Sequence, residues 1–133
     1  MIVVDTSAVT AIAFGEDSAA ELLDIMANEQ CVMSAASRVE LGIVIEARLG
    51  PSGIQLVEEL LLRCDIDIVA FDQTDAASAI MAWRRFGKGR HTAGLDFGDC
   101  FSYALAHRLG APLLFTGDDF RLTDLPIAVV PAD

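Results

Sequence analysis

Long apolar runs are absent from this sequence of 133 residues. Apolar stretches such as residues 2–4 and 60–62 are far shorter than the roughly 18 residues that a membrane-spanning helix needs. No basic segment followed by an apolar one opens the chain, as an export signal would. We therefore expect a cytoplasmic protein that does not enter a membrane.

Cysteine and histidine are scarce, and neither is spaced as a metal ligand. The three cysteines, Cys31, Cys64 and Cys100, are odd in number and widely separated, which is typical of reduced, buried thiols in a cytoplasm. The two histidines, His91 and His107, also lack the spacing of a zinc site. These patterns exclude a disulfide framework and argue against zinc.

Positive charge is also in short supply. Nine Lys and Arg residues stand against twenty Asp and Glu residues, for a net charge of −11. A protein that holds nucleic acid through its overall field needs the opposite sign, because lysine and arginine neutralise phosphates. Four of the nine basic residues nevertheless fall within one short segment followed by His91: Arg84, Arg85, Lys88 and Arg90. This cluster is either a solvated helix end and loop or a local phosphate-binding surface.

Core-forming residues are plentiful, since 53% of the chain is hydrophobic. A chain of this length can bury a core without disulfides or structural zinc, so we predict one domain over residues 1–133. Short β-branched runs predict strands at 2–4, 31–33, 66–71 and 112–115, with a possible fifth at 127–130. Apolar spacing and N-cap residues predict the helices between them, at 7–14, 18–28, from Ser34 or Ser37 to 49, and at 54–63, 74–87 and 97–109. We expect Thr6 or Ser7, Ser18 and Thr74 to cap three of these helices.

Alternating short strands and helices predict an α/β fold. Each crossover helix must bury one stripe of side chains, so the sheet should be parallel and covered on both faces. Residues 50–53, Gly-Pro-Ser-Gly, should break the chain between two of the helices. The segment 87–94, with three glycines and part of the basic cluster, should form an exposed loop.

Four acidic residues fall where the chemistry of an open parallel sheet collects, beyond the carboxyl ends of its strands. Asp5 directly follows the first strand, and Asp118 lies just past the fourth. Glu40 lies in the first turns of the helix after the second strand, and Asp99 in the first turn of the helix that leads to the fourth strand. Only a folded sheet could bring these four residues together.

Each acidic residue also has an ordinary structural explanation. Asp5 could cap a helix, Glu40 could complete a capping box with Ser37, Asp99 could pair with the Asp96 cap, and Asp118 could be a turn residue. Two observations favour more than capping. At helical spacing Glu40 shares a stripe with apolar side chains, and Asp99 shares one with Ser102, Tyr103 and Ala106, so both carboxylates would lose hydration on folding.

Carboxylates that crowd together without a basic partner favour a divalent cation. They raise each other's pKa unless a cation resolves the repulsion, and an all-oxygen ligand set suits Mg²⁺ or Mn²⁺. A Mg²⁺ ion that keeps some of its waters offsets phosphate charge and activates water for in-line attack. The pattern therefore indicates phosphodiester hydrolysis.

Two other classes of protein fit parts of this pattern. A Mg²⁺-dependent phosphotransfer protein could use Asp72 as a phosphoacceptor, but the only lysine, Lys88, is misplaced for that role, and a phosphatase would need an aspartate where Ser7 stands. A non-catalytic acidic binding module would need the carboxylates only as helix caps. These alternatives stay open on the residues alone.

Four ordered motifs resemble the PIN-domain family, specifically its VapC-like toxins. They cover residues 3–8, 37–40, 95–106 and 113–120, with the sequences VVDTSA, SRVE, LDFGDCFSYALA and LLFTGDDF. The resemblance extends over essentially the whole chain and is most specific in the third and fourth motifs. One departure is Asp96, where similar toxins often carry asparagine.

The resemblance implies a PIN-like three-layer domain, with a parallel sheet of four or five strands, that acts as a Mg²⁺-dependent endoribonuclease, with Mn²⁺ as a possible substitute. It implies that Asp5 and Asp99 bind the metal, that Asp118 binds it directly or through water, and that Glu40 orients or deprotonates the attacking water. Thr116 would hydrogen-bond within the site, and the cluster from Arg84 to Arg90 would follow RNA phosphates. The family also implies a homodimer that is silenced by a cognate antitoxin.

Overall fold

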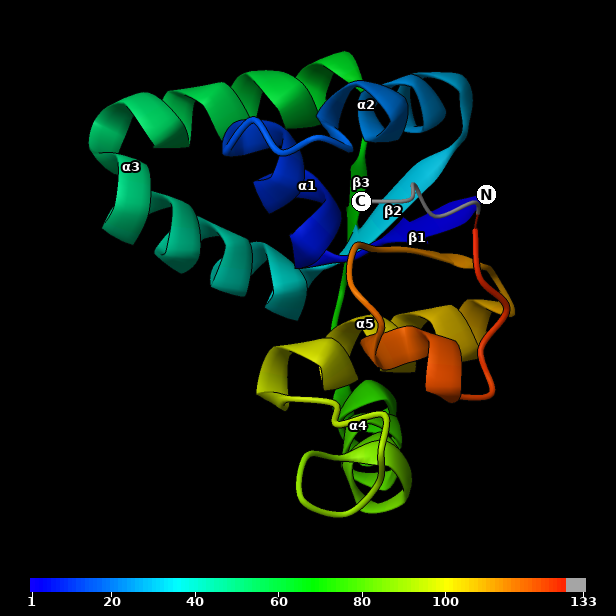
Figure 1. Ribbon diagram of the computed structural model, residues 1–133. Helices are drawn as coiled ribbons and strands as arrows, with labels where there is room; N and C mark the ends of the chain where they lie inside the picture. Colours follow the sequence, from blue (N-terminus) through cyan, green and yellow to red (C-terminus); the bar gives the residue numbers. More distant parts are fainter. Residues whose placement is uncertain (129–133) are drawn as a thin grey trace.

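A four-stranded parallel sheet forms the centre of the protein in a computed structural model, which describes residues 1–128 (Figure 1). The strands are β1 (Ile2–Val4), β2 (Cys31–Ser34), β3 (Asp67–Val69) and β4 (Leu113–Leu114). Their order is β3-β2-β1-β4, so that β1 is a central strand. The prediction of an α/β fold with a parallel sheet is confirmed.

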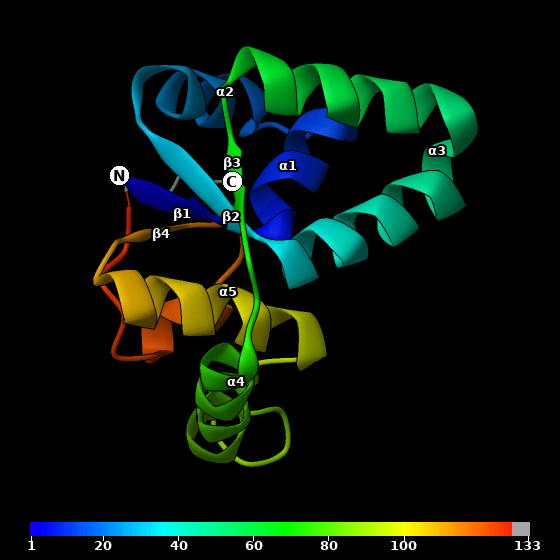
Figure 2. The same ribbon diagram turned by 180° about the vertical axis from the view of Figure 1, so that it is seen from behind.

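Helices cover both faces of this sheet (Figures 1 and 2). On one face lie α1 (Thr6–Ala13), α2 (Ala19–Asn28) and α3 (Ala35–Arg63). On the other lie α4 (Gln73–Phe86) and α5 (Phe97–Leu109), and a 3-10 turn, η1 (Asp119–Leu122), follows β4. The three layers match the predicted PIN-like architecture.

Successive strand residues supply the two cores in turn. Val3 and Val32 pack with α4 and α5, whereas Ile2, Val4 and Met33 pack with the helices on the opposite face. Adjacent side chains of a strand point to opposite faces of the sheet, so strands buried on both faces must be apolar throughout. This arrangement holds the carboxyl end of β1, where Asp5 follows, rigidly between the two layers.

The longest helix, α3, bends sharply at Gly50. The backbone of Gly50 has a φ of 64° and a ψ of −156°, and Pro51 starts the second arm at the first helical position, where proline fits. The predicted break is therefore present but shorter than the expected segment 50–53. Neither α3 nor any other helix among residues 1–128 combines the length and the apolar character that crossing a bilayer requires.

Helix starts agree with the predictions only in part, because at α1 and α4 a side chain one or two positions earlier takes over the capping role. Asp5 caps α1 in place of Thr6 or Ser7, Ser34 caps α3, and Asp72 caps α4 in place of Thr74. Ser18 occupies the predicted capping position but makes no side-chain capping bond. Ser37 therefore lies inside the helix, which rules out the alternative explanation of Glu40 as its partner in a capping box.

The edges of the sheet are shorter than predicted. β3 spans three residues of the expected segment 66–71, and β4 two residues of 112–115. In the expected fifth strand, Ile127 forms a single bridge with Leu113, and positions 129 and 130 lie outside the described residues.

A buried ion pair fixes α5 against α4. Arg108 Nε donates to Asp75 Oδ1 at 2.8 Å, and Asp75 is almost fully buried. Burial by itself would raise the pKa of Asp75, but the Arg108 guanidinium and the Asp72 backbone N–H hold it below its ordinary value. The pair fixes the helix that carries Asp99.

Candidate active site

Asp5 lies buried at the carboxyl end of β1 and accepts three hydrogen bonds. Its Oδ2 atom accepts from the Ser7 backbone N–H at 3.0 Å and from the Ser7 hydroxyl at 2.6 Å. Its Oδ1 atom accepts from the Ser102 hydroxyl of α5 at 2.5 Å. Burial raises the pKa of Asp5 despite these three donors. The expected helix cap is therefore real, but a cap alone does not require a buried carboxylate.

Asp99 lies in the first turn of α5 and forms a capping box with Asp96. Asp99 Oδ2 accepts from the Asp96 N–H, and Asp96 Oδ1 accepts from the Asp99 N–H, both at 2.9 Å. Burial raises the pKa of Asp99 to about 8, and the charges of Asp5 and Asp96 add to that effect against the opposing backbone bond. Asp99 is thus both a capping residue and an acid that resists ionisation.

Glu40 reaches across from α3 to the backbone of α5. A Cβ atom placed on Gly98 would overlap the Glu40 carboxylate, so the two helices approach this closely only because residue 98 is glycine. Burial raises the pKa of Glu40, the nearby Thr6 hydroxyl opposes the shift, and the charges of Asp5 and Asp96 add to it. The influence of Asp5 on both other acids shows that the structure brings Asp5, Glu40 and Asp99 together.

We call Asp5, Glu40 and Asp99 the acidic cluster. Its members offer only oxygen ligands, and no lysine or arginine is among the described groups that shift their pKa values. Within residues 1–128 no three His, Cys, Asp or Glu side chains converge closely enough to hold an ion by themselves. This geometry fits Mg²⁺, which is usually bound by one or two carboxylates and keeps several waters.

Asp118 stands apart from this cluster. Its side chain is 94% exposed and lies 3.8 Å from Arg121 in an ion pair within η1. The backbone turns at Gly117, with a φ of 89°, immediately before it. The neighbouring Asp119, which sequence reasoning passed over, is the residue of this turn whose charge raises the pKa of Asp99. Two adjacent aspartates cannot be told apart from sequence when a turn decides which one faces the site.

The sequence pattern did not identify most of the hydroxyl groups that surround Asp5. Ser7 Oγ accepts a hydrogen bond from the Thr116 backbone N–H at 3.1 Å, which ties the start of α1 to the segment that follows β4. Thr116 therefore joins the site, as predicted, but through its backbone. Ser102 was noticed only as a neighbour of Asp99 on α5. Its place among apolar residues on that stripe was the signal that could have identified it.

The basic cluster lies at the end of α4 and in the loop that leads to α5, which Figure 1 shows on the side of α5 away from the sheet. Arg85 pairs with Asp124 at 3.3 Å, and Arg90 stacks over the Trp83 ring at 4.6 Å from its centroid. Lys88 has no ion-pair partner in the described part of the chain. Arg85 and Arg90 thus have structural partners, whereas Arg84 donates only to the Met81 sulfur, at 3.5 Å, and like Lys88 has no ion-pair partner among the described residues.

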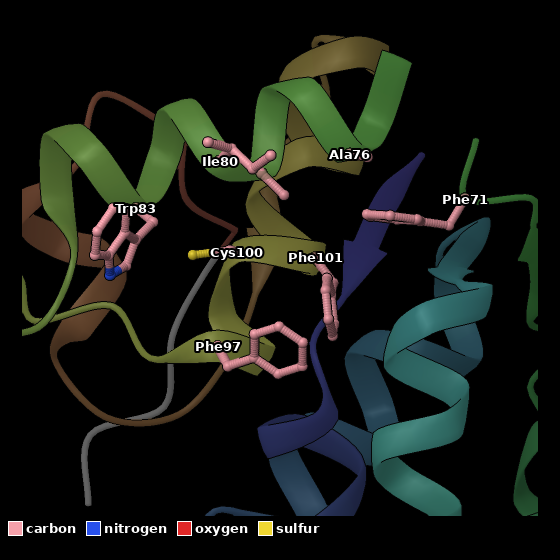
Figure 3. Close-up of a pocket in the computed structure, with 8 residues that line it drawn as sticks. Phe71, Ala76, Ile80, Trp83, Phe97, Cys100 and Phe101 are labelled. Carbon is pink, nitrogen blue, oxygen red and sulfur yellow. The ribbon is translucent and has the colours of Figure 1, made fainter. Parts of the chain in front are cut away.

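Two apolar hollows flank Phe97, which is 81% exposed beside the acidic cluster. Figure 3 shows the hollow between α4 and α5, of about 390 Å³, where Ile80 and Trp83 face Phe97 and Phe101. The other, of about 400 Å³, lies between α3 and α5 and includes Glu40 in its lining. An apolar surface of this kind beside a polar site marks a place for a larger partner.

Comparisons with known proteins agree on one family. The model of the PIN domain matches residues 2–125. A ribonuclease VapC of Mycolicibacterium smegmatis is 49% identical over 125 residues, which cover 93% of this chain and 97% of that protein.

Solved structures show the same fold at low identity. The toxin VapC20 of Mycobacterium tuberculosis, described as cleaving the sarcin–ricin loop, superposes with a TM-score of 0.76 at 17% identity, covering 94% of this chain and 96% of that one. A chain of a toxin–antitoxin complex from Klebsiella pneumoniae superposes with a TM-score of 0.71 at 15% identity, covering 96% and 97%. At these identities the likeness establishes the fold alone.

Proposed function

Since the chain belongs to the PIN-domain family and, within it, to the VapC ribonuclease toxins, we propose that it cleaves RNA phosphodiester bonds at the acidic cluster with the help of a divalent cation. The observation that carries this proposal is that Asp5 raises the pKa values of both Glu40 and Asp99 at one edge of the sheet, with no lysine or arginine among the described groups that shift the pKa values of the three acids. One buried and two half-buried acids with raised pKa values are costly unless they serve a cation.

We propose a role for each acid from the ligands that it offers. Asp5 and Asp99 would hold Mg²⁺, or Mn²⁺ in its place, and Asp118 is retained only as a ligand that would act through water, because its carboxylate points into solvent. When bound, the cation would offset phosphate charge and make a bound water more acidic. Asp119 is the alternative acid from the same turn.

We propose that Glu40 accepts a proton from the attacking water. A carboxylate whose pKa is raised above its ordinary value binds a proton more strongly than an ordinary glutamate, which favours its use as a general base. In the proposed step the water oxygen bonds to phosphorus and its proton passes to Glu40. The bond from phosphorus to the ribose oxygen breaks, and that oxygen keeps the electron pair and takes a proton from solvent water to leave as a hydroxyl group.

The test is cleavage of total RNA by the wild type and by Asp99→Asn, each with and without Mg²⁺ or Mn²⁺, followed by sequencing of the cut ends. We expect discrete metal-dependent cuts that the variant loses. Cuts that survive in Asp99→Asn, or that are absent with every metal, would favour the non-catalytic binding module. A stable aspartyl-phosphate after treatment with acetyl phosphate would instead favour the phosphotransfer alternative.

The basic cluster offers a second measurable property of the RNA complex. We propose that Arg84 and Lys88 contact phosphates, because Arg85 and Arg90 are already engaged by Asp124 and Trp83. Each phosphate contact to single-stranded RNA contributes about 0.7 to the slope of log affinity against log salt concentration. The double variant Arg84→Ala/Lys88→Ala should therefore lower the slope by about 1.4 if both contacts form. An unchanged slope would remove the cluster from the RNA-binding surface.

Two protein partners, a cognate antitoxin and a second copy of the chain, complete the proposal. The toxin–antitoxin complex among the solved structures and the exposed apolar surface around Phe97 support a protein partner. A segment seated on that surface would lie over Glu40 and Asp99, so its binding would block the site.

A further inference from the structure

Two buried serines connect α3 and α5, the helices that carry Glu40 and Asp99. Ser37 of α3 and Ser102 of α5 are both almost fully buried, and their hydroxyl oxygens lie 3.3 Å apart. Ser102 donates its only hydroxyl proton to Asp5 Oδ1 at 2.5 Å. Ser102 must therefore accept in its contact with Ser37, and the two hydroxyls form a directed relay from Ser37 through Ser102 to Asp5.

The hydrogen bonds to Asp5 leave one lone-pair site on its carboxylate unoccupied. A carboxylate offers about four lone-pair sites, two on each oxygen. The Ser7 backbone N–H and hydroxyl take both sites on Oδ2, and Ser102 takes one on Oδ1. One site on Oδ1 remains for a ligand, so the hydrogen bonds fix both the oxygen and the angle at which a cation can approach.

The positions of the two serines couple all three acids. Ser102 lies three residues after Asp99, and Ser37 lies three residues before Glu40, so each serine is about one helical turn from an acid on the same helix. The contact between the serines joins α3 to α5 next to Asp5 of the acidic cluster. Thr6 strengthens this junction, since its hydroxyl donates to the Ser37 carbonyl at 3.3 Å.

We propose that Ser37 and Ser102 are positioning residues that orient Asp5 for a divalent cation and set the spacing between Asp5, Glu40 and Asp99. This inference rests on the proposed function and deepens it. Ser102 acts on Asp5 directly, whereas Ser37 acts only through Ser102. The relay therefore predicts that loss of the Ser102 hydroxyl weakens metal binding more than loss of the Ser37 hydroxyl does. Simple loss of packing would not produce this order.

The experiment measures Mn²⁺ affinity by the loss of the free-ion electron paramagnetic resonance signal, for the wild type, Ser37→Ala, Ser102→Ala and the double variant. Removing a group that orients a metal ligand typically weakens metal affinity by about 10- to 100-fold, which is the change expected for Ser102→Ala. Ser37→Ala should have a smaller effect, and the double variant should be no weaker than Ser102→Ala. Unconnected losses would multiply instead.

Ser18→Ala is the matched control, because Ser18 is also a buried serine but its hydroxyl finds no hydrogen-bond partner within the described residues. It should bind Mn²⁺ as tightly as the wild type. Thermal melting without metal checks that each variant folds, and if Ser102→Ala does not melt cooperatively, Ser37→Ala decides the question. Wild-type affinity in the folded serine variants, or multiplied losses in the double variant, would overturn the relay alone. A wild type that binds no Mn²⁺ would overturn the proposed function and the relay with it.

Discussion

Gly98→Ala is expected to slow RNA cleavage by about 100-fold or more while leaving the protein folded. The added Cβ would occupy the space of the Glu40 carboxylate, which is the flexible end of a side chain and can swing away. Swinging away removes the proposed general base from its position, and a misplacement of about 1 Å can cost 100-fold in rate. Alanine favours helix more than glycine by about 1 kcal/mol, and this gain offsets the cost of displacing the Glu40 carboxylate. The melting temperature should therefore change little.

Gly42→Ala provides the matched control for this prediction. Gly42 lies inside α3, and its added Cβ would meet only the Arg38 guanidinium at 3.3 Å, again the end of a flexible side chain. We expect this variant to keep wild-type activity. In a Glu40→Ala background the further change Gly98→Ala should cost little activity, since the group it displaces is already gone. Full activity in Gly98→Ala, measured with the same RNA, would show that Glu40 is not needed where the structure places it.

The layered fold was predictable because the local patterns and the global arrangement agree. Val3 and Val4 face opposite layers, and only a sheet buried on both sides accepts an uninterrupted apolar strand. Helix ends were harder, because Asp5 and Asp72 displaced neighbouring Thr and Ser residues as caps, and capping depends on which side chain reaches a free N–H. Strand lengths at the sheet edge depend on pairing with a neighbour, and a single sequence does not record that pairing.

The acidic cluster was predictable in part. Asp5, Glu40 and Asp99 each follow an element boundary at one edge of the sheet, so the topology alone brings them together. Asp118 illustrates what the sequence does not determine, because the positive φ at Gly117 sets the direction of the next residues. The Ser37–Ser102 contact joins positions 65 residues apart and depends on the crossing of α3 and α5.

In the metal-free protein, the acids that we propose for catalysis lower the free energy of unfolding as the pH rises. Folding moves the pKa of Asp99 from 3.8 to about 8, so the folded protein keeps a proton that the unfolded chain releases. The free energy of unfolding contributed by Asp99 is therefore fully present below pH 3.8 and falls as the pH rises toward about 8. The raised pKa values of Asp5 and Glu40 act in the same direction.

Asp99→Asn should therefore raise the melting temperature of the metal-free protein at pH 8 and reduce its decline with pH, although it removes cleavage. Asparagine has nearly the same shape and can still accept the Asp96 N–H bond with its side-chain oxygen, so the helix cap survives. The measurement is thermal melting from pH 5 to pH 9 in chelator and in Mg²⁺. Mg²⁺ at one hundred times its Kd would stabilise the wild type by about 2.7 kcal/mol, and the variant should lose most of that gain.

Asp118→Asn is the control for charge removal as such, because its carboxylate lies in solvent rather than in the cluster. It should melt like the wild type at every pH. A lower metal-free melting temperature for Asp99→Asn at pH 8 would mean that the Asp99 carboxylate stabilises the fold, and the acidic cluster would then be a structural feature rather than a cost met by a cation. A higher melting temperature together with a lost response to Mg²⁺ would link the instability of the cluster to its use.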